Sequence, residues 1–304
     1  MAALRMISAV HGPLRIFVLT AATMVAFAGN ALLCRAALRG GALDVVSFTV
    51  IRLASATLML AAIVRVRSGP GQLARAGSWY SAVVLIVYAI TFSLAYVRIG
   101  ASTGALLMCG AVQLTMMTGA LVRGERPTLR QWFGFATAVI GLVVVNLPSL
   151  DPPPPLGATL MLASGVTWGM YSLHGRDATQ PAAANAGTFL RSLPFVAALT
   201  VVAFATSVHL TERGVIFAIA SGAVATGLGY VTWYAVMPSL GAARGAIVQL
   251  AIPVIATAGA IVLLDEPLER HVVFGGAVLL GGLVLALWRP PPRAGPEPAP
   301  SLPE

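Results

Sequence analysis

Long apolar stretches separated by short polar segments run through almost the whole chain. Ten of them are about 20 residues long, which is the length that a helix needs to cross the hydrocarbon core of a bilayer. The connections between them are only a few residues long, so we expect no soluble domain of any size. The pattern predicts membrane-spanning helices at residues 16–36, 44–64, 79–97, 102–122, 130–147, 156–175, 183–207, 214–236, 243–263 and 269–288.

The second half of the chain repeats the first half at a constant spacing of 141 residues. A repeat of five spans ends on the opposite side of the membrane from where it begins, so the second copy must be inverted. Inverted repeats around a site at the bilayer midplane are typical of secondary transporters. Chance recurrence of small residues is the alternative, but the register holds over several segments without a gap. The matches include Arg35 with Arg176, Gly100 with Gly241, Gly104 with Gly245, Glu125 with Glu266, Gly134 with Gly275, and Gly141 with Gly282.

These patterns predict an all-α polytopic membrane protein of ten transmembrane helices, arranged as two inverted five-helix repeats. The first repeat is expected at residues 1–150 and the second at residues 151–289. Pro148, Asp151 and the prolines at 152–155 mark the boundary, because such a run cannot continue a helix. Residues 290–304 are rich in proline and small residues, which predicts a disordered cytoplasmic tail.

Composition and charge agree with a membrane protein. Of the 304 residues, 58% are hydrophobic and 10% are charged, a composition that the surface of a water-soluble domain could not carry. The 19 basic residues are all arginine, so a Walker-type ATP site, which needs a lysine, is excluded. An excess of these arginines in one set of loops predicts that both termini are cytoplasmic, in a bacterial inner membrane. Orientation and attraction to anionic lipid then explain the net charge of +9 without a nucleic-acid partner.

The sequence offers no pattern for a metal or a cofactor. Cys34 and Cys109 lie within apolar spans and are expected to be free thiols, with a disulfide between them as the alternative. The four histidines do not combine with the cysteines at metal-ligand spacing. We therefore expect a small-molecule substrate and membrane lipid as the partners, no cofactor, and a monomer.

Several local motifs resemble the drug/metabolite transporter superfamily, and within it the ten-span permeases built from two EamA-type repeats. The resemblance covers nearly the whole chain, although Phe27 and Ala28 depart from the pattern in the first copy. It implies export or facilitated movement of small metabolites by alternating access, with amino acids, aromatic ones included, as the expected substrates. The matching residues are Trp168, Gly169 and Arg176 opening the second half, Gly124–Pro127 and Leu264–Pro267 as span endings, and the in-span arginines Arg52 and Arg191.

Arg52 and Arg191 each lie about eight residues into a span, where a charge is costly unless it is paired or faces a wet cavity. One interpretation is a clamp for a substrate carboxylate. The other, which we favour, is that each arginine holds backbone carbonyls of a neighbouring helix. The acidic residues all lie at predicted span ends, in loops or in the tail. This placement predicts transport driven by the substrate gradient, or coupled through an unconventional group such as His174, rather than by a buried carboxylate.

Aromatic and amide side chains at helical spacing predict the walls of a substrate cavity. Hydrogen bonding between helices is the alternative for each of them. Pro253 should kink the ninth span four residues after Gln249, and we predict that it is a hinge. The residues expected to contact substrate are Asn30, Tyr88, Gln113, Trp168, Tyr171, Tyr230, Trp233 and Gln249.

Three other functions compete with a carrier of amino acids. A passive small-solute channel would give flux that does not saturate, and a nucleotide-sugar carrier of the same superfamily would need more basic groups in its cavity. An intramembrane enzyme would need a nucleophile with a base. Only His174 near Ser172 hints at one, and side chains two residues apart on a helix point away from each other. We therefore expect no enzymatic activity.

Overall fold

The computed structural model describes residues 12–38, 41–68, 76–99, 101–147, 152–178, 180–205, 209–264 and 268–288. The predicted tail, the linker residues Pro148 to Asp151, and the repeat positions Gly100 and Glu266 lie outside the described residues. Within the described part the elements are helical: α2 (Pro13–Leu38), α3 (Val45–Ser68), α5 (Trp79–Tyr96), α6 (Ala101–Val122), α7 (Leu129–Asn146), α8 (Pro155–Arg176), α9 (Pro181–Ala205), α10 (Glu212–Ala220), the π-helix η3 (Ser221–Leu228), α11 (Gly229–Gln249), α12 (Ala251–Leu264) and α13 (Arg270–Leu287).

The described helices form ten spans, as predicted. Eight helices are apolar and long enough to cross a membrane, and one of them runs from Glu212 to Gln249. Gly241 divides this helix, because its φ of 77° and ψ of 168° are not helical. The eighth span therefore ends at Leu240, beyond the predicted end at residue 236, and the ninth runs from Ala242 through α12. The tenth is α8, which is less apolar than the others and packs against both α5 and α6.

Two irregularities in the second half have local causes. The π-helix η3 lies against α3 at Gly222, where an added Cβ would come within 2.2 Å of the Arg52 carbonyl oxygen. In the ninth span the helix is interrupted at Leu250, between α11 and α12. Pro253 has no N–H to donate to the carbonyl of Gln249 four residues earlier, which accounts for the interruption.

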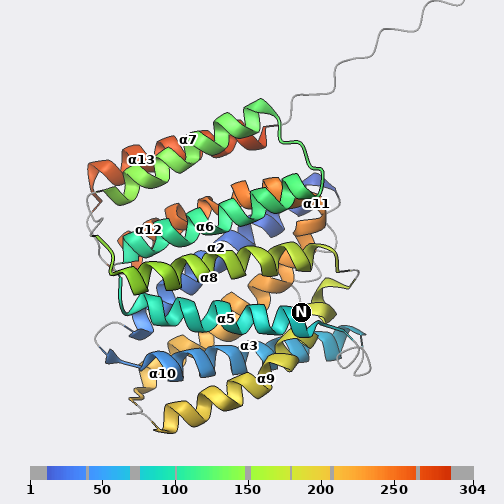
Figure 1. The fold of residues 1–304 in the computed structure, drawn as a ribbon, viewed down its shortest axis with the longest axis vertical. Helices are drawn as coiled ribbons and strands as arrows, with labels where there is room; N and C mark the ends of the chain where they lie inside the picture. The colour runs from blue at the N-terminus through green and yellow to red at the C-terminus, as the bar shows by residue number, and fades with distance from the viewer. Residues whose placement is uncertain are drawn as a thin grey trace, which may run out of the picture.

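The pairing of α7 with α13 demonstrates the inversion of the two repeats. Gly134 faces Gly282 and Gly141 faces Gly275, so the two helices run antiparallel although they occupy equivalent positions in the repeat. A Cβ added to Gly134 would lie 2.6 Å from the Gly282 carbonyl oxygen, and one added to Gly282 would lie 2.6 Å from the Gly134 carbonyl oxygen. Figure 1 shows this pair at one edge of the bundle, with α9 at the opposite edge.

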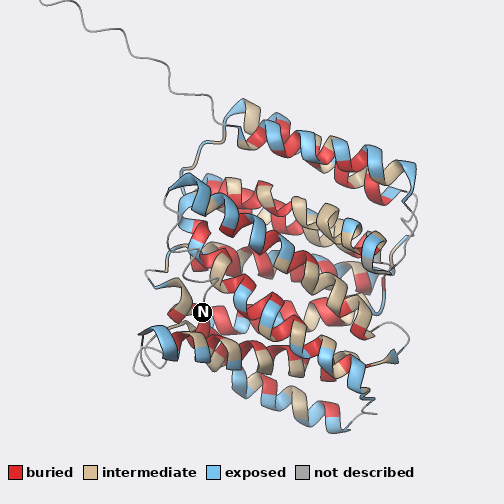
Figure 2. Ribbon diagram, turned by 180° about the vertical axis from the view of Figure 1, so that it is seen from behind, coloured by how far each residue is buried: buried red, intermediate tan, exposed pale blue. Residues whose placement is uncertain are grey.

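Burial follows the helix faces. Figure 2 shows buried residues where neighbouring helices face one another and exposed residues on outward faces, where the large apolar side chains would contact lipid. We call the end of the bundle that holds Arg35, Tyr96 and Asn146 the Arg35 end. The opposite end, which holds Glu125, Arg176 and Gly241, is called the Arg176 end.

Candidate functional site

A cluster of aromatic rings occupies the centre of the bundle. Trp168 lies at its middle, with ring centroids 5.0 Å from Tyr230, 5.3 Å from Tyr88 and 5.4 Å from Phe27. Phe27 and Trp168 match at the 141-residue spacing, so their contact lies where the two repeats meet. Tyr171 continues the cluster by stacking on Trp168 at 5.9 Å. The structure therefore brings together the predicted aromatic residues from α5, α8 and α11, with Phe27 of α2 as a member that the sequence did not single out.

The polar groups of this cluster have partners within the protein. Trp168 Nε1 donates a hydrogen bond of 2.8 Å to Gln249 Oε1, and Trp233 Nε1 donates one of 3.2 Å to Ser172 Oγ. Tyr171 donates to Asn185 Oδ1 at 2.5 Å. In this conformation these side chains therefore bond between helices, and their role toward substrate stays a prediction.

The two predicted amides away from the rings differ in their surroundings. Asn30 Oδ1 accepts a hydrogen bond of 2.7 Å from Ser221 Oγ of η3. Gln113 is 2% exposed, and its Oε1 has no hydrogen-bond partner among the described residues. An orphaned buried oxygen costs about 1–3 kcal/mol, so Gln113 is a group that a ligand or another conformation could satisfy.

The two in-span arginines bind different groups. Arg191 donates to the backbone carbonyls of Ala76 and Gly187, the latter at 3.1 Å. Arg52 is buried between helices, where it donates to the hydroxyls of Tyr88 and Thr226, each at 3.3 Å, and its guanidinium lies 5.7 Å from the centroid of the Tyr88 ring. The contacts of Arg191 are those of a structural arginine, whereas those of Arg52 connect α3 to the aromatic cluster.

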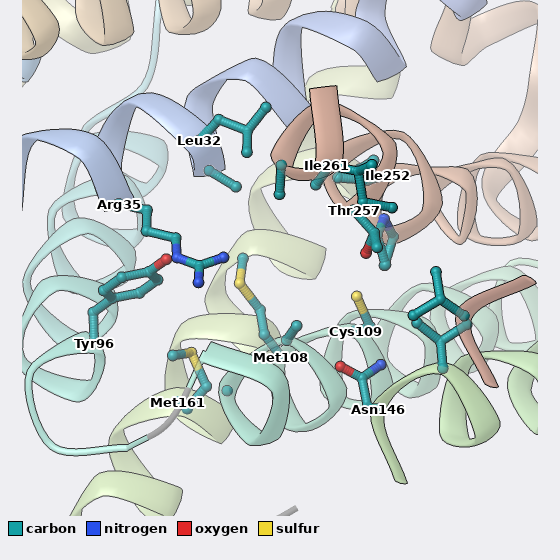
Figure 3. Close-up of a pocket in the computed structure, with 18 of the residues that line it drawn as sticks. Leu32, Arg35, Tyr96, Met108, Cys109, Asn146, Met161, Ile252, Thr257 and Ile261 are labelled. Carbon is teal, nitrogen blue, oxygen red and sulfur yellow. The ribbon is translucent and has the colours of Figure 1, made fainter. Parts of the chain in front are cut away.

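A pocket of about 420 Å³ opens at the Arg35 end of the bundle. It lies among α2, α5, α6, α7, α8, α12 and α13, with apolar walls and a few polar groups (Figure 3). Of the site residues predicted from the sequence, only Pro253 is among those that line it. The polar residues of its lining are Arg35, Tyr96, Asn146, Thr257, Glu269 and His271.

These polar lining residues were missed because most of them lie near span ends, where we expected lipid or loop contacts. Glu269, in particular, precedes α13, and its Oε2 lies 3.1 Å from Nδ1 of His271. The signal that could have identified Arg35 is its match with Arg176 in the repeat. Equivalent positions in inverted halves face the same central path from opposite ends.

The Arg176 end is closed by a charged contact that we call the Glu125 clasp, formed by Glu125, Arg176 and the backbone of residues 242–243. The Glu125 carboxylate forms a salt bridge with Arg176 and accepts hydrogen bonds from the N–H groups of Ala242 at 3.0 Å and Ala243 at 3.1 Å. Because the backbone breaks at Gly241, these N–H groups begin a helix and attract a negative charge. The clasp therefore joins the ends of α6 and α8 to the start of the ninth span.

The pKa of Glu125 is lowered by this arrangement. Partial burial alone would raise it, but the two backbone donors and the Arg176 guanidinium together outweigh burial. Glu125 is thus ionised whenever the clasp is formed at neutral pH.

Packing at the Arg176 end is tight where the Arg35 end is hollow. Gly104 of α6 lines the pocket, and its repeat equivalent Gly245 lies against Met237, whose Sδ would be 2.8 Å from an added Cβ. Gly175 lies against the ring of Tyr234, within 2.0 Å of an added Cβ. The same sequence pattern thus forms an open pocket at one end and a packed, clasped contact at the other.

Ten antiparallel spans in inverted halves, with a pocket open at one end only, define a multi-pass membrane transporter. The EamA-like transporter family model matches residues 14–147 and 155–288. The chain belongs to this family, whose members are transporters and not enzymes. The two matches begin 141 residues apart, which is the spacing of the repeat, while the predicted domain limits at 150 and 289 stay a prediction.

Similar proteins extend over most of the chain. An uncharacterized protein of Pseudomonas aeruginosa is 48% identical over 273 residues, covering 90% of this chain and 94% of that protein. A probable amino-acid metabolite efflux pump of Escherichia coli is 27% identical over 239 residues, covering 70% of this chain and 80% of the pump. One solved crystal structure shares the fold, with a TM-score of 0.78 at 18% identity, covering 91% of this chain and 98% of that chain.

Proposed function

We propose that the chain is a secondary transporter that exports amino acids or closely related metabolites across a bacterial inner membrane by alternating access. The observation that carries the proposal is the difference between equivalent ends of the two repeats. One end forms a pocket beside Arg35, and the other is closed by the Glu125 clasp. If the halves exchange these arrangements, the pocket opens on the opposite side, which is the motion that alternating access requires.

The distribution of arginines supports an orientation. Cytoplasmic loops of membrane proteins carry an excess of basic residues. In the described part of the chain, more arginines lie near the Arg176 end than near the Arg35 end, so we assign the Arg176 end to the cytoplasm. The described conformation is then outward-open, and both termini are cytoplasmic. The arginines at the Arg176 end are Arg15, Arg65, Arg67, Arg123, Arg126, Arg130, Arg176 and Arg244, and those at the Arg35 end are Arg35, Arg98, Arg213 and Arg270.

The similarity to an amino-acid metabolite efflux pump of Escherichia coli favours amino-acid-like substrates. Counterflow in proteoliposomes tests the function directly. Vesicles loaded with an unlabelled amino acid should accumulate the labelled form transiently, and the uptake should saturate. Flux that does not saturate, without counterflow, would indicate a passive channel and refute the carrier.

The two cysteines of the chain test the orientation and the open state. Cys109 lines the pocket, whereas Cys34 is 0% exposed. In a Cys34→Ser variant, a membrane-impermeant thiol reagent added outside intact cells should label Cys109, and a transported substrate should slow the labelling. Labelling that occurs only in inside-out vesicles would show that the assigned orientation is wrong. The Cys109→Ser variant, which keeps Cys34, provides the matched control and should stay unlabelled.

A further inference from the structure

The pocket at the Arg35 end combines one cation, one carboxylate and an apolar wall. Arg35 extends from the last turn of α2, and Figure 3 shows its guanidinium beside the phenol of Tyr96. Glu269, paired with His271, lies in the same lining. Met108 and Met161 supply part of the apolar wall (Figure 3). A ligand that satisfies all three must carry both charges and an apolar group.

The chain itself contains a model for how Arg35 would bind a ligand. Arg176 occupies the equivalent position in the second repeat, and it binds the carboxylate of Glu125. A guanidinium presents a planar set of donors that matches a carboxylate in two parallel hydrogen bonds. At the Arg176 end the carboxylate comes from the protein, whereas at the Arg35 end the equivalent arginine lines a pocket open to small solutes.

The apolar wall is adaptable but limited in size. Methionine side chains are flexible and polarizable, so they fit apolar groups of different shapes. The wall is closest at Gly104, where an added Cβ would lie 3.0 Å from Cε of Met161. A volume of about 420 Å³ is within the usual range for small-molecule sites.

We propose that the pocket binds α-amino acids with apolar side chains as zwitterions, with Arg35 as the ligand of the substrate carboxylate. Glu269 faces the substrate ammonium group, and Met108 and Met161 contact its side chain. This assignment rests on the proposed function and adds the recognising residues and the substrate class to it.

Direct binding to the purified protein in detergent tests the assignment independently of transport. Leucine and leucinamide share a side chain and an amino group, but only leucine has a carboxylate. The wild-type protein should bind leucine at least about 10-fold more tightly than leucinamide, because a charge-assisted hydrogen bond contributes about 1.5–3 kcal/mol and 1.4 kcal/mol is a factor of ten. In Arg35→Gln this ratio should fall to less than about 3-fold, since the remaining contacts are common to both ligands.

Two further variants keep the test decisive. Arg98→Gln removes an arginine at the same end of the bundle that donates to the Leu94 carbonyl and does not line the pocket, so its ratio should equal that of the wild type. Arg35→Lys keeps the charge without the planar fork and should give an intermediate ratio, which remains measurable if Arg35→Gln does not fold. If Arg35 only holds the helices together, the Arg35 variants would weaken both ligands equally, and the inference would be overturned.

Side-chain size gives a second measurement on the same site. Gly104→Ala should weaken the binding of phenylalanine more than that of alanine, because the added methyl group narrows the pocket beside Met161. Gly110→Ala, on the same helix with open space around the added Cβ, should leave both unchanged. Equal effects of the two substitutions would exclude Gly104 from the substrate wall. Ligand binding without counterflow would refute the transport function while leaving the binding site intact.

Discussion

The glycine contacts between α7 and α13 predict a large effect from a single methyl group. In Gly282→Ala the new Cβ would lie 2.4 Å from the Ala138 nitrogen and 2.6 Å from the Gly134 carbonyl oxygen. Ordinary contacts of a Cβ begin at about 3.4 Å, so the helices must separate by about 1 Å. Both neighbours are backbone atoms and cannot rotate away. Overpacking of this kind typically costs about 1–3 kcal/mol.

The measurement is thermal unfolding of the purified protein in detergent. At about 2–4 °C for each kcal/mol, the midpoint of Gly282→Ala should fall by about 2–10 °C. Gly281→Ala is the matched control, because its Cβ meets nothing within 4 Å and alanine is a better helix former than glycine by about 1 kcal/mol. Equal midpoints for the two variants would refute the close backbone contact. Gly134→Ala combined with Gly282→Ala should cost less than the sum of the single changes, since one separation accommodates both methyl groups.

Three further predictions concern polar contacts. Glu125→Gln should lower the unfolding midpoint at pH 7 but not at pH 3, because a carboxylate with a lowered pKa stabilises the fold above its ordinary pKa and loses that contribution as pH falls; a difference that persists at pH 3 contradicts the clasp. Gln113→Leu should raise the unfolding free energy by about 1 kcal/mol by removing an orphaned oxygen, and should slow counterflow if this amide serves substrate; a drop in stability would mean that the oxygen has a partner. Trp168→Phe should cost about 1–3 kcal/mol by leaving Gln249 Oε1 unpaired. Adding Gln249→Leu should recover part of that cost in the same melting assay, and full additivity would show that the hydrogen bond is not formed.

The spans and their inversion follow from the sequence because they depend on local hydrophobicity and on a fixed spacing. Gly134 and Gly141, which the repeat matches to Gly275 and Gly282, also form the closest helix contact. The break at Gly241 and the π-helix η3 did not follow. They depend on how closely Glu125 and α3 approach those segments, and neither approach is visible in a hydrophobic pattern.

The position of the pocket could not be predicted for a different reason. Arg35 and Arg176 occupy equivalent positions, so the repeat alone does not tell which of them faces an open pocket and which is bound in a clasp. Helical spacing placed Tyr88, Trp168 and Tyr230 correctly on one another's side of their helices. It could not distinguish faces that meet in a packed cluster from faces that line a cavity, since both need apolar surfaces with a few polar groups.

The π-helix η3 affects the energetics of the transport cycle that we propose. Two perfectly matched inverted halves would make the outward-open and inward-open arrangements mirror states of equal free energy. Only the second half contains η3 among the described residues, whereas α5, its counterpart, is an unbroken α-helix. The degeneracy is therefore lifted, and without substrate the protein must rest preferentially on one side of the membrane.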